Sequence, residues 1–244
     1  MEVTYLGHYG DDLTVVNAAR VSFAKKSQLV EKFVRRGFLE DDYEMVLADK
    51  DVRLIKYLVA HGHVLPFRHP HVSFHFKAPI FVARQLVKHQ VGMSWSEISR
   101  RYVTGEPEFF WPEKWRAAAP DKKQGSLDEE WEQTQLSVRG DLVPVAVSLT
   151  TQAPWEDWAK MTTGNLIELY NNAVENGLAP EQARMILPAN LYTEWHWTGS
   201  LLAWAHVWKL RVAHDAQKET QDCARQIGPT MEKLFPVSWK ALTE

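Results

Sequence analysis

Cysteine is almost absent from this 244-residue chain, in which Cys223 stands alone. A single cysteine excludes an intrachain disulfide and gives no sign of an oxidising compartment. Long apolar runs are absent too, because the longest uncharged stretches, 142–155 and 195–208, are shorter than the about 20 residues of a membrane-spanning helix. An excess of positive charge is also missing: 28 Lys and Arg residues face 31 Asp and Glu residues, for a formal net charge of −3. This balance argues against a protein that binds nucleic acid polymers without sequence preference.

Several motifs of common enzyme classes are missing. The chain has neither the G-x-G-x-x-G turn of dinucleotide-binding folds nor a Walker-type phosphate loop, and it has no G-x-S-x-G nucleophile elbow. The N-terminal residues MEVTYLG do not combine a basic segment with an apolar core, so no signal peptide is predicted and a cytoplasmic protein is expected. Hydrophobic residues make up 45% of the chain and charged residues 24%, which is typical of a globular protein.

The hydrophobic patterns predict an α+β fold with a modest antiparallel sheet packed with helices, not repeated βαβ units. Strands are expected at 2–7, 71–76, 98–103 and 190–198, and helices at 13–23, 49–61, 79–90, 156–176, 180–187, 199–211 and 213–235. Polar and apolar residues alternate in 71–76, so one face of that strand is expected to be buried. Residues 1–244 are interpreted as one domain, with a variable insertion at about 112–154 that holds a helix and long loops.

The densest group of polar side chains lies in ARQLVKHQVGMSWSEISRRYV, residues 83–103. On a helix, Arg84 and Lys88 are i, i+4 neighbours, as are Gln85 and His89. Gly92 is expected to end that helix, and the loop after it carries hydroxyls, a carboxylate and two arginines: Ser94, Ser96, Glu97, Ser99, Arg100 and Arg101. Arginine forks, hydroxyls and turn N–H groups are the donors that a phosphate monoester needs. The segment therefore predicts a phosphate-ester site, and a solvated helix edge followed by a loop is the alternative.

Two other groups leave alternatives open. Arg184 precedes an apolar turn, and Arg211 and His206 lie on an otherwise apolar helix. A charge at the end of such a helix either complements the helix dipole or contacts a buried ligand. Five histidines within 61–75 either bind a metal such as zinc or partly line a ligand cleft, and the lack of a cysteine or aspartate among them favours the cleft. Cys223 has no evident base nearby in the sequence and is interpreted as a packing residue.

Three long blocks follow one another along the chain. They are YLVAHGHVLPFRHPHVSFHFKAPIFVARQ at 57–85, KHQVGMSWSEISRRY at 88–102, and ARMILPANLYTEWHWT followed by LR and AQKE within 183–219. These blocks resemble the flavin-dependent thymidylate synthases, whose signature reads R-H-R, spacer, S-x-N-E-x-S-x-R-Y. AARVSF at 18–23 also fits, and together the blocks cover more than half of the chain.

The resemblance implies reductive methylation of dUMP to dTMP in a homotetramer, with methylenetetrahydrofolate as carbon donor and FAD and NADPH as the hydride source. FAD is expected at subunit interfaces, and neither a nucleic acid polymer nor a membrane is expected as a partner. The implied flavin-binding set is His63, Lys88, His89, Gln90, Val91, Glu97, Ser200 and His206. The implied nucleotide-binding set is Gln85, Lys88, Glu97, Ser99, Arg100, Arg101, Arg184 and Arg211. Two of these are expected to be catalytic: Arg211 stabilises charge that develops on the pyrimidine ring, and Ser99 assists at the phosphate.

The signature also departs from the family pattern. Lys88 and Gln90 replace two arginines, which removes one charge and two planar forks. One extra residue lies between Gln90 and Ser99, and Ser96 stands where asparagine is usual. These departures leave open a related nucleotide hydroxymethylase or a methylase of another pyrimidine nucleotide. A metal-dependent hydrolase that uses the 61–75 histidines and a noncatalytic nucleotide-binding protein are the rival hypotheses.

Overall fold

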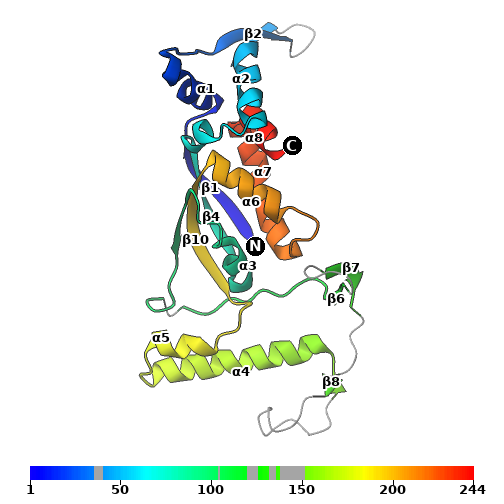
Figure 1. The fold of residues 1–244 in the computed structure, drawn as a ribbon. Coiled ribbons are helices and arrows are strands. Elements are labelled where there is room, and N and C mark those ends of the chain that lie inside the picture. The colour runs from blue at the N-terminus through cyan, green and yellow to red at the C-terminus, as the bar shows by residue number, and fades with distance from the viewer. Residues whose placement is uncertain (36–40, 104, 120–125, 132–135, 138–151) are drawn as a thin grey trace. The chain divides into compact units, whose positions relative to one another are not determined.

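The computed structural model describes residues 1–35, 41–103, 105–119, 126–131, 136–137 and 152–244 (Figure 1). The chain divides into two compact units. Unit 1 comprises 1–78, 82–97 and 194–244, and unit 2 comprises 79–81 and 98–193. The predicted α+β class with antiparallel strands is confirmed. The prediction of a single domain with an insertion at 112–154 stays a prediction.

A four-stranded sheet lies at the centre of unit 1. Its strands run in the order β1 (Glu2–Tyr9), β4 (His71–Pro79), β10 (Tyr192–Ser200) and β5 (Met93–Glu97). β1 is antiparallel to β4, and β5 is antiparallel to β10 with Trp195 opposite Glu97. The strands predicted at 2–7, 71–76 and 190–198 are therefore confirmed, each with a longer C-terminal end.

Aromatic side chains fill the buried face of this sheet. Phe74 and Phe76 of β4 and Trp195 and Trp197 of β10 are at most 2% exposed. The rings of Phe76 and Trp195 stack with centroids 5.1 Å apart, and Phe74 meets Trp204 edge to face at 5.0 Å. Aromatic pairs in these geometries add to the energy of apolar burial. The alternation in the sequence thus predicted correctly which face of β4 is buried.

Helices cover that face and one end of the sheet. α6 (Leu201–Arg211), α7 (Lys218–Leu234) and α8 (Pro236–Thr243) contact one another, and α7 also contacts β1 (Figure 1). α1 (Asp12–Arg20) and α2 (Asp49–Ala60) pack against each other and against α8. Three shorter elements complete the helical part: α3 (Ile80–Leu86) and the 3-10 turns η1 (Val21–Phe23) and η2 (Leu65–Arg68). β2 (Val30–Arg35) and β3 (Asp41–Val46) form a separate antiparallel pair.

Capping residues explain why these helices begin and end where they do. Asp11 accepts a hydrogen bond from the Thr14 N–H at 2.8 Å and so caps α1. Gly62 follows α2 with a φ of +69°, a left-handed conformation that glycine adopts without steric cost. α6 begins at Ser200, whose hydroxyl accepts from the Ala203 N–H at 3.3 Å.

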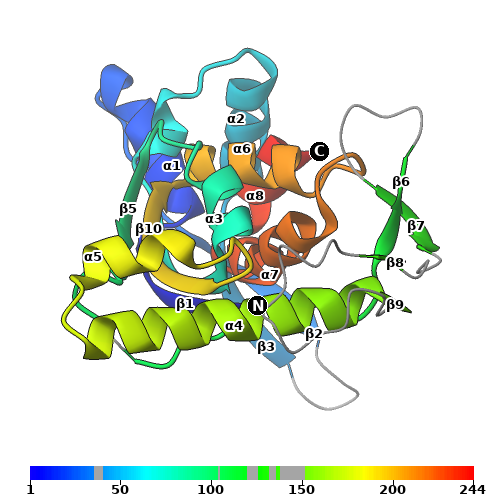
Figure 2. The ribbon, with the colours of Figure 1, turned by 90° about the horizontal axis from the view of Figure 1, so that it is seen from below.

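Unit 2 consists of short strands and one long helix. β6 (Arg116–Ala118) pairs antiparallel with β7 (Ser126–Glu130), and β8 (Leu136–Ser137) pairs antiparallel with β9 (Gln152–Ala153). α4 (Trp155–Glu175) is followed by α5 (Pro180–Ala183) and by the 3-10 turn η4 (Arg184–Ile186). α5 and η4 lie against α4 (Figure 2).

Two predictions around the densest polar cluster were wrong. No strand forms at 98–103, because β5 ends at Glu97 and the N–H groups of Tyr102 and Val103 turn back to the Ser99 carbonyl. The helix expected at 79–90 is shorter, because Pro79 still belongs to β4 and α3 ends at Leu86. Lys88, His89 and Gln90 therefore lie beyond the helix. The helical i, i+4 relations expected for Arg84 with Lys88 and for Gln85 with His89 do not hold.

Other differences concern boundaries. The helix expected within 112–154 is absent from the described part of that range, which forms β6 to β9; 120–125, 132–135 and 138–151 lie outside the described residues. α6 begins at Leu201 because Gly199 and Ser200 continue β10, and α7 begins only at Lys218. None of the helices in the described ranges combines the length and apolar composition that a membrane span requires.

Candidate functional site

The predicted site residues are divided between the two units. Unit 2 contains Ser99, Arg100, Arg101 and Arg184. The other ten lie in unit 1: His63, Gln85, Lys88, His89, Gln90, Val91, Glu97, Ser200, His206 and Arg211. Within unit 1, the structure brings Gln85, His89 and Arg211 into direct contact.

The last residue of α6 joins the segment that follows α3. Arg211 Nε donates to Nε2 of His89 at 2.9 Å, and a terminal guanidinium nitrogen of Arg211 donates to the Gln85 backbone carbonyl at 3.3 Å. An imidazole nitrogen can accept only when it carries no proton, so His89 is neutral and holds its proton on Nδ1. The His89 ring also faces Trp197 at a centroid distance of 6.5 Å. The guanidinium is thus held at two points by groups that do not neutralise its charge.

The electrostatics agree with this geometry. Burial, and after it the charges of Arg211 and His206, lowers the pKa of His89 from its ordinary 6.5 to about 4. Burial also lowers the pKa of Arg211. The described hydrogen bonds of the Arg211 side chain go to an imidazole and a carbonyl, not to a carboxylate. A half-buried cation of this kind can stabilise negative charge on a ligand.

Residues at the start of α7 extend this contact and were not predicted. The Gln85 side-chain N–H donates to Oε1 of Gln217, and the Thr220 hydroxyl donates to Oε1 of Gln85 at 3.2 Å. Gln217 Nε2 in turn donates to Oε2 of Glu219 at 2.9 Å. The sequence did contain a signal for these residues, because the AQKE segment at 216–219 belongs to the blocks that resemble the family. No residue of that segment was predicted to belong to the site.

The segment after α3 presents exposed side chains. Val91 is 82% exposed, and Lys88 and Gln90 are exposed as well. Gly92 closes the segment with a φ of +74°, and a Cβ there would lie 3.0 Å from the Ser200 hydroxyl. Gly92 therefore lets this segment turn directly against the start of α6.

The remaining predicted flavin residues differ in exposure. Ser200 is 3% exposed, and its hydroxyl caps α6. His206 and His63 are exposed. Glu97 is exposed and accepts from Trp95 Nε1 at 3.1 Å. The assignment of these four residues to a cofactor stays a prediction.

The predicted phosphate ligands of unit 2 lie in turns. The Ser99 hydroxyl accepts from the backbone N–H of Arg101 at 3.3 Å and from its Nε at 3.2 Å. Arg100 donates to the Gly105 carbonyl at 2.5 Å. Arg184, in η4, is exposed and donates to the Glu181 carbonyl at 3.4 Å. Ser99 thus orients Arg101, and Arg101 and Arg184 each keep guanidinium N–H groups for an anion.

The histidines of 61–75 are not gathered around one point. His75 pairs with Glu194 at 3.2 Å, whereas His71 Nδ1 contacts the His69 carbonyl at 2.9 Å. His69 follows η2 and lies before β4, so it does not share the strand face of His71 and His75. Among the described residues, no group of three or more His, Cys, Asp or Glu is placed to hold a metal ion. The metal-hydrolase hypothesis gains no support from this part of the chain.

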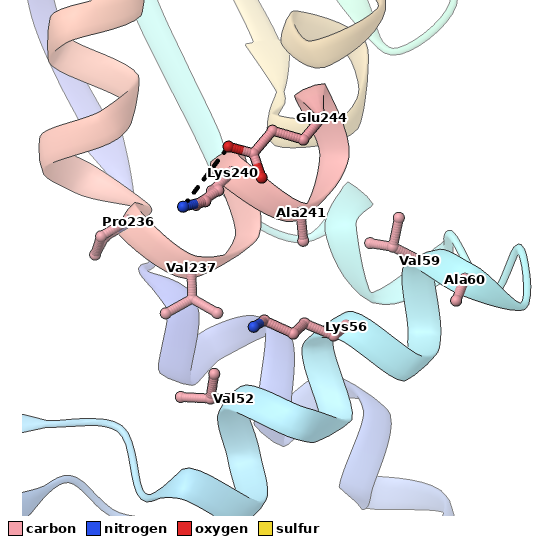
Figure 3. A pocket seen from close by; sticks show the side chains of 9 residues that line it. All are labelled: Val52, Lys56, Val59, Ala60, Pro236, Val237, Lys240, Ala241 and Glu244. Carbon is pink, nitrogen blue, oxygen red and sulfur yellow. Dashed lines mark ion pairs between the residues drawn. The ribbon is translucent and has the colours of Figure 1, made fainter.

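A cavity of about 440 Å³ lies elsewhere, between α2 and α8 (Figure 3). Its walls are mostly apolar, and two lysines and a glutamate point toward it: Lys56, Lys240 and Glu244. Lys240 and Glu244 pair with each other at 3.6 Å. None of the predicted site residues lines this cavity, so we place the candidate site at Arg211 and not here.

The comparisons with known proteins identify the family. A family model described as thymidylate synthase complementing protein, Thy1, matches residues 4–237. The chain belongs to this family. It is 35% identical over 246 residues to a flavin-dependent thymidylate synthase of Thermus thermophilus, which covers 99% of this chain and 75% of that protein. It is 33% identical over 235 residues to the corresponding enzyme of Thermosipho africanus, with 95% of this chain and 86% of that protein covered.

A solved structure supports the same conclusion. The UMP/dUMP methylase PolB of Streptomyces cacaoi, bound with 5-Br dUMP, superimposes on this Thy1 chain with a TM-score of 0.72 at 25% identity. The match covers 99% of this chain and 94% of PolB. The match spans both compact units, so the Thy1 fold includes unit 2 as well as the sheet of unit 1.

The donors of this Thy1 chain fit a flavin dinucleotide. The exposed ammonium of Lys88 suits a diphosphate, the Gln90 amide suits a heterocycle edge, and Val91 offers an apolar surface. The side chains of Lys88 and Gln90 form no hydrogen bond or ion pair with other residues in the described ranges. Their donors are therefore available to a cofactor.

Proposed function

We propose that this protein methylates dUMP to dTMP, with methylenetetrahydrofolate as carbon donor and FAD and NADPH as the source of hydride. One observation carries the proposal: a half-buried arginine, Arg211, is held by a neutral histidine beside an exposed strip of flavin-type donors. The chain that carries this arrangement matches flavin-dependent thymidylate synthases over almost its whole length.

Arg211 has the chemistry that pyrimidine methylation requires. Carbon 5 of uracil is a weak nucleophile, so the ring must be polarised before it can attack a one-carbon unit. A guanidinium at the pyrimidine edge stabilises the negative charge that develops on the ring. His89 and the Gln85 carbonyl orient Arg211 for this role without consuming its charge.

The alternative activation by a cysteine does not suit this chain. Cys223, the single cysteine, is fully buried, and burial raises the pKa of its thiol to about 12. A thiol of that kind forms almost no thiolate at neutral pH and cannot add to a pyrimidine ring. This supports a route in which ring polarisation replaces covalent addition.

Arginines hold the nucleotide phosphate in this proposal. Arg101, oriented by Ser99, and Arg184 offer planar guanidinium groups that match phosphate oxygens. Arg100 precedes Arg101 in the sequence. Ser99 adds a hydroxyl at the same phosphate. Glu97 contacts a sugar hydroxyl or fixes the loop, and Lys88 serves both nucleotide and flavin.

The flavin residues form a second part of the site. His63, His89, Gln90, Val91, Ser200 and His206 would hold the cofactor, which supplies the reducing equivalents that convert the transferred one-carbon unit to a methyl group. The chain's own residues would orient the cofactor and the nucleotide and exclude water. We further propose a homotetramer, supported by large apolar side chains that are exposed in the single chain, such as Phe23 at 73% and Val21 at 72%.

Visible spectroscopy and product analysis test this function. The purified protein is expected to show flavin absorption that bleaches on addition of NADPH. With dUMP and methylenetetrahydrofolate, it is expected to release dTMP, identified by mass spectrometry. A colourless protein that binds dUMP without turnover would instead support the noncatalytic hypothesis, and a hydroxymethylated product would identify the related hydroxymethylase.

UMP is a second candidate substrate. PolB is a UMP/dUMP methylase, and a second solved structure shows it bound with 5-Br UMP. That structure matches this chain with a TM-score of 0.69. A competition assay with equal concentrations of UMP and dUMP separates the two candidates. A product containing mainly 5-methyluridine monophosphate would make UMP the substrate.

A further inference from the structure

Three side chains connect the start of α7 to the candidate pyrimidine site. Glu219 accepts from Gln217, Gln217 accepts from Gln85, and the Gln85 backbone carbonyl accepts from Arg211. Glu219 is only 6% exposed, so its carboxylate is held in the protein interior. We call Glu219, Gln217 and Gln85 the amide relay.

The relay has one direction because it begins at a carboxylate. An ionised carboxylate only accepts hydrogen bonds, so Gln217 must turn its NH₂ group toward Glu219. Its carbonyl then faces Gln85, which must turn its own NH₂ group toward Gln217. The hydroxyl of Thr220, a residue with no exposed surface, donates to the Gln85 carbonyl and supports the same orientation.

We propose that Glu219 and Gln217 are positioning residues that fix the orientation of the Gln85 amide and thereby select uracil over cytosine. The inference rests on the proposed function, in which Gln85 contacts the nucleotide. Among the described residues, the Gln85 amide keeps one N–H and one acceptor lone pair for a ligand.

Base chemistry explains how a fixed amide selects. Uracil presents an N–H donor at N3 and a carbonyl acceptor at O4, whereas cytosine presents an acceptor at N3 and an amine donor at position 4. An amide that cannot rotate offers its donor and acceptor in one order, which matches only one of these edges. A site built this way rejects the other base because its own polar groups are left unpaired.

The variant Glu219→Gln tests the inference with little change in size. A glutamine at this position can donate or accept, so the orientation of Gln217 and Gln85 is no longer determined. We expect dUMP binding to flavin-loaded protein to weaken about tenfold, as for the loss of one well-placed hydrogen bond. The preference for dUMP over dCMP is expected to fall by a similar factor, while flavin content and the melting temperature change little.

The double variant Gln217→Glu/Glu219→Gln provides a rescue. The carboxylate now lies at 217 and accepts from both Gln85 and the new amide, so the orientation of Gln85 is restored. We expect dUMP affinity and the preference for dUMP over dCMP to recover to within about threefold of the starting protein. The double variant restores the donor and acceptor order of the relay, although the carboxylate lies at a different position. Glu232→Gln, at an exposed position of the same helix, is the matched control and is expected to change neither.

The outcomes separate the relay from the proposed function. If the starting protein forms dTMP but Glu219→Gln keeps full selectivity, the relay is wrong and the function stands. Loss of selectivity without rescue by the double variant also overturns the relay. If the starting protein binds flavin but neither nucleotide, the proposed function fails first. Should Glu219→Gln not fold, Thr220→Val removes the supporting donor and must lower the dUMP preference for the inference to hold.

Discussion

Burial lowers the pKa of both members of the Arg211–His89 pair. Arg211 lies in the last turn of α6, where a cation is favoured by the helix dipole. Its guanidinium also donates to His89 and to the Gln85 carbonyl. The helix-dipole alternative therefore holds, and the contact with a buried ligand stays a prediction. The lowered pKa of His89 keeps the imidazole neutral and able to accept from the guanidinium.

This coupling predicts a measurable titration. In Arg211→Gln, the pKa of His89 is expected to rise from about 4 toward 6.5, but not fully, because burial remains the larger cause. The imidazole signals of His89, followed by NMR from pH 3 to 8, report the change. Arg225→Gln, on α7, is the control and is expected to leave the pKa of His89 unchanged. An unmoved His89 pKa in Arg211→Gln would mean that the two groups do not interact.

The lowered pKa of His89 also makes the free energy of unfolding depend on pH. The folded protein binds a proton at His89 less readily than the unfolded chain, whose histidine titrates near 6.5. The free energy of unfolding contributed by this site is therefore constant above pH 6.5 and falls as the pH drops from 6.5 to about 4.

Cys223 should be dispensable for turnover. The thiol has no exposed surface, and the variant Cys223→Ser places a hydroxyl in the same buried position. We expect kcat to stay within about twofold, while the free energy of unfolding falls by about 1–3 kcal/mol because a polar group is buried. Steady-state kinetics and urea unfolding check the two parts. A variant that folds but forms no dTMP would overturn ring activation without cysteine.

Among the helices, α8 depends on a residue far away in sequence. Its own N-cap, Phe235, makes no side-chain capping bond. Asp12, the first residue of α1, instead accepts from the N–H groups of Val237 and Ser238 at 2.8 and 2.9 Å. Burial of Asp12 raises the pKa of its carboxyl, and these hydrogen bonds oppose that rise. Helix α8, which sequence periodicity did not predict, is thus completed by a tertiary contact.

Removing this cap should destabilise the fold. Asp12→Ala leaves the N–H groups of Val237 and Ser238 without their acceptor and is expected to lower the free energy of unfolding by about 1–3 kcal/mol. Asp49→Ala, at an exposed first-turn position of α2, is the control and is expected to stay within about 0.5 kcal/mol. Chemical denaturation of both variants makes the comparison, and equal effects would show that Asp12 does not cap α8.

Several large apolar side chains are exposed in the described part of the chain. Tyr9, Val21, Phe23 and Val91 are each more than 60% exposed, with Val91 reaching 82%. Two of them, Val21 and Phe23, form η1 within the AARVSF segment. Such residues mark surfaces that other copies of the chain cover in the proposed tetramer.

Introducing a charge at η1 tests that assembly. The starting protein is expected to elute with a mass of about 112 kDa, four times the 28.1 kDa of one chain. Phe23→Asp is expected to shift the population to smaller species in light scattering after gel filtration. Lys25→Asp, which adds the same side chain at an exposed polar position, is the control. A starting protein of 28.1 kDa would contradict the tetramer.

Sequence patterns identified the α+β class, the buried face of β4 and the segments that carry the candidate site. Those features follow from local rules, namely side-chain alternation and motif order, which act between neighbours along the chain. Long-range contacts were needed for the rest: Asp12 caps α8, and the Gln85 side chain donates to Gln217. Hydrogen bonds between residues more than a hundred positions apart leave no period in the sequence, so packing alone establishes them.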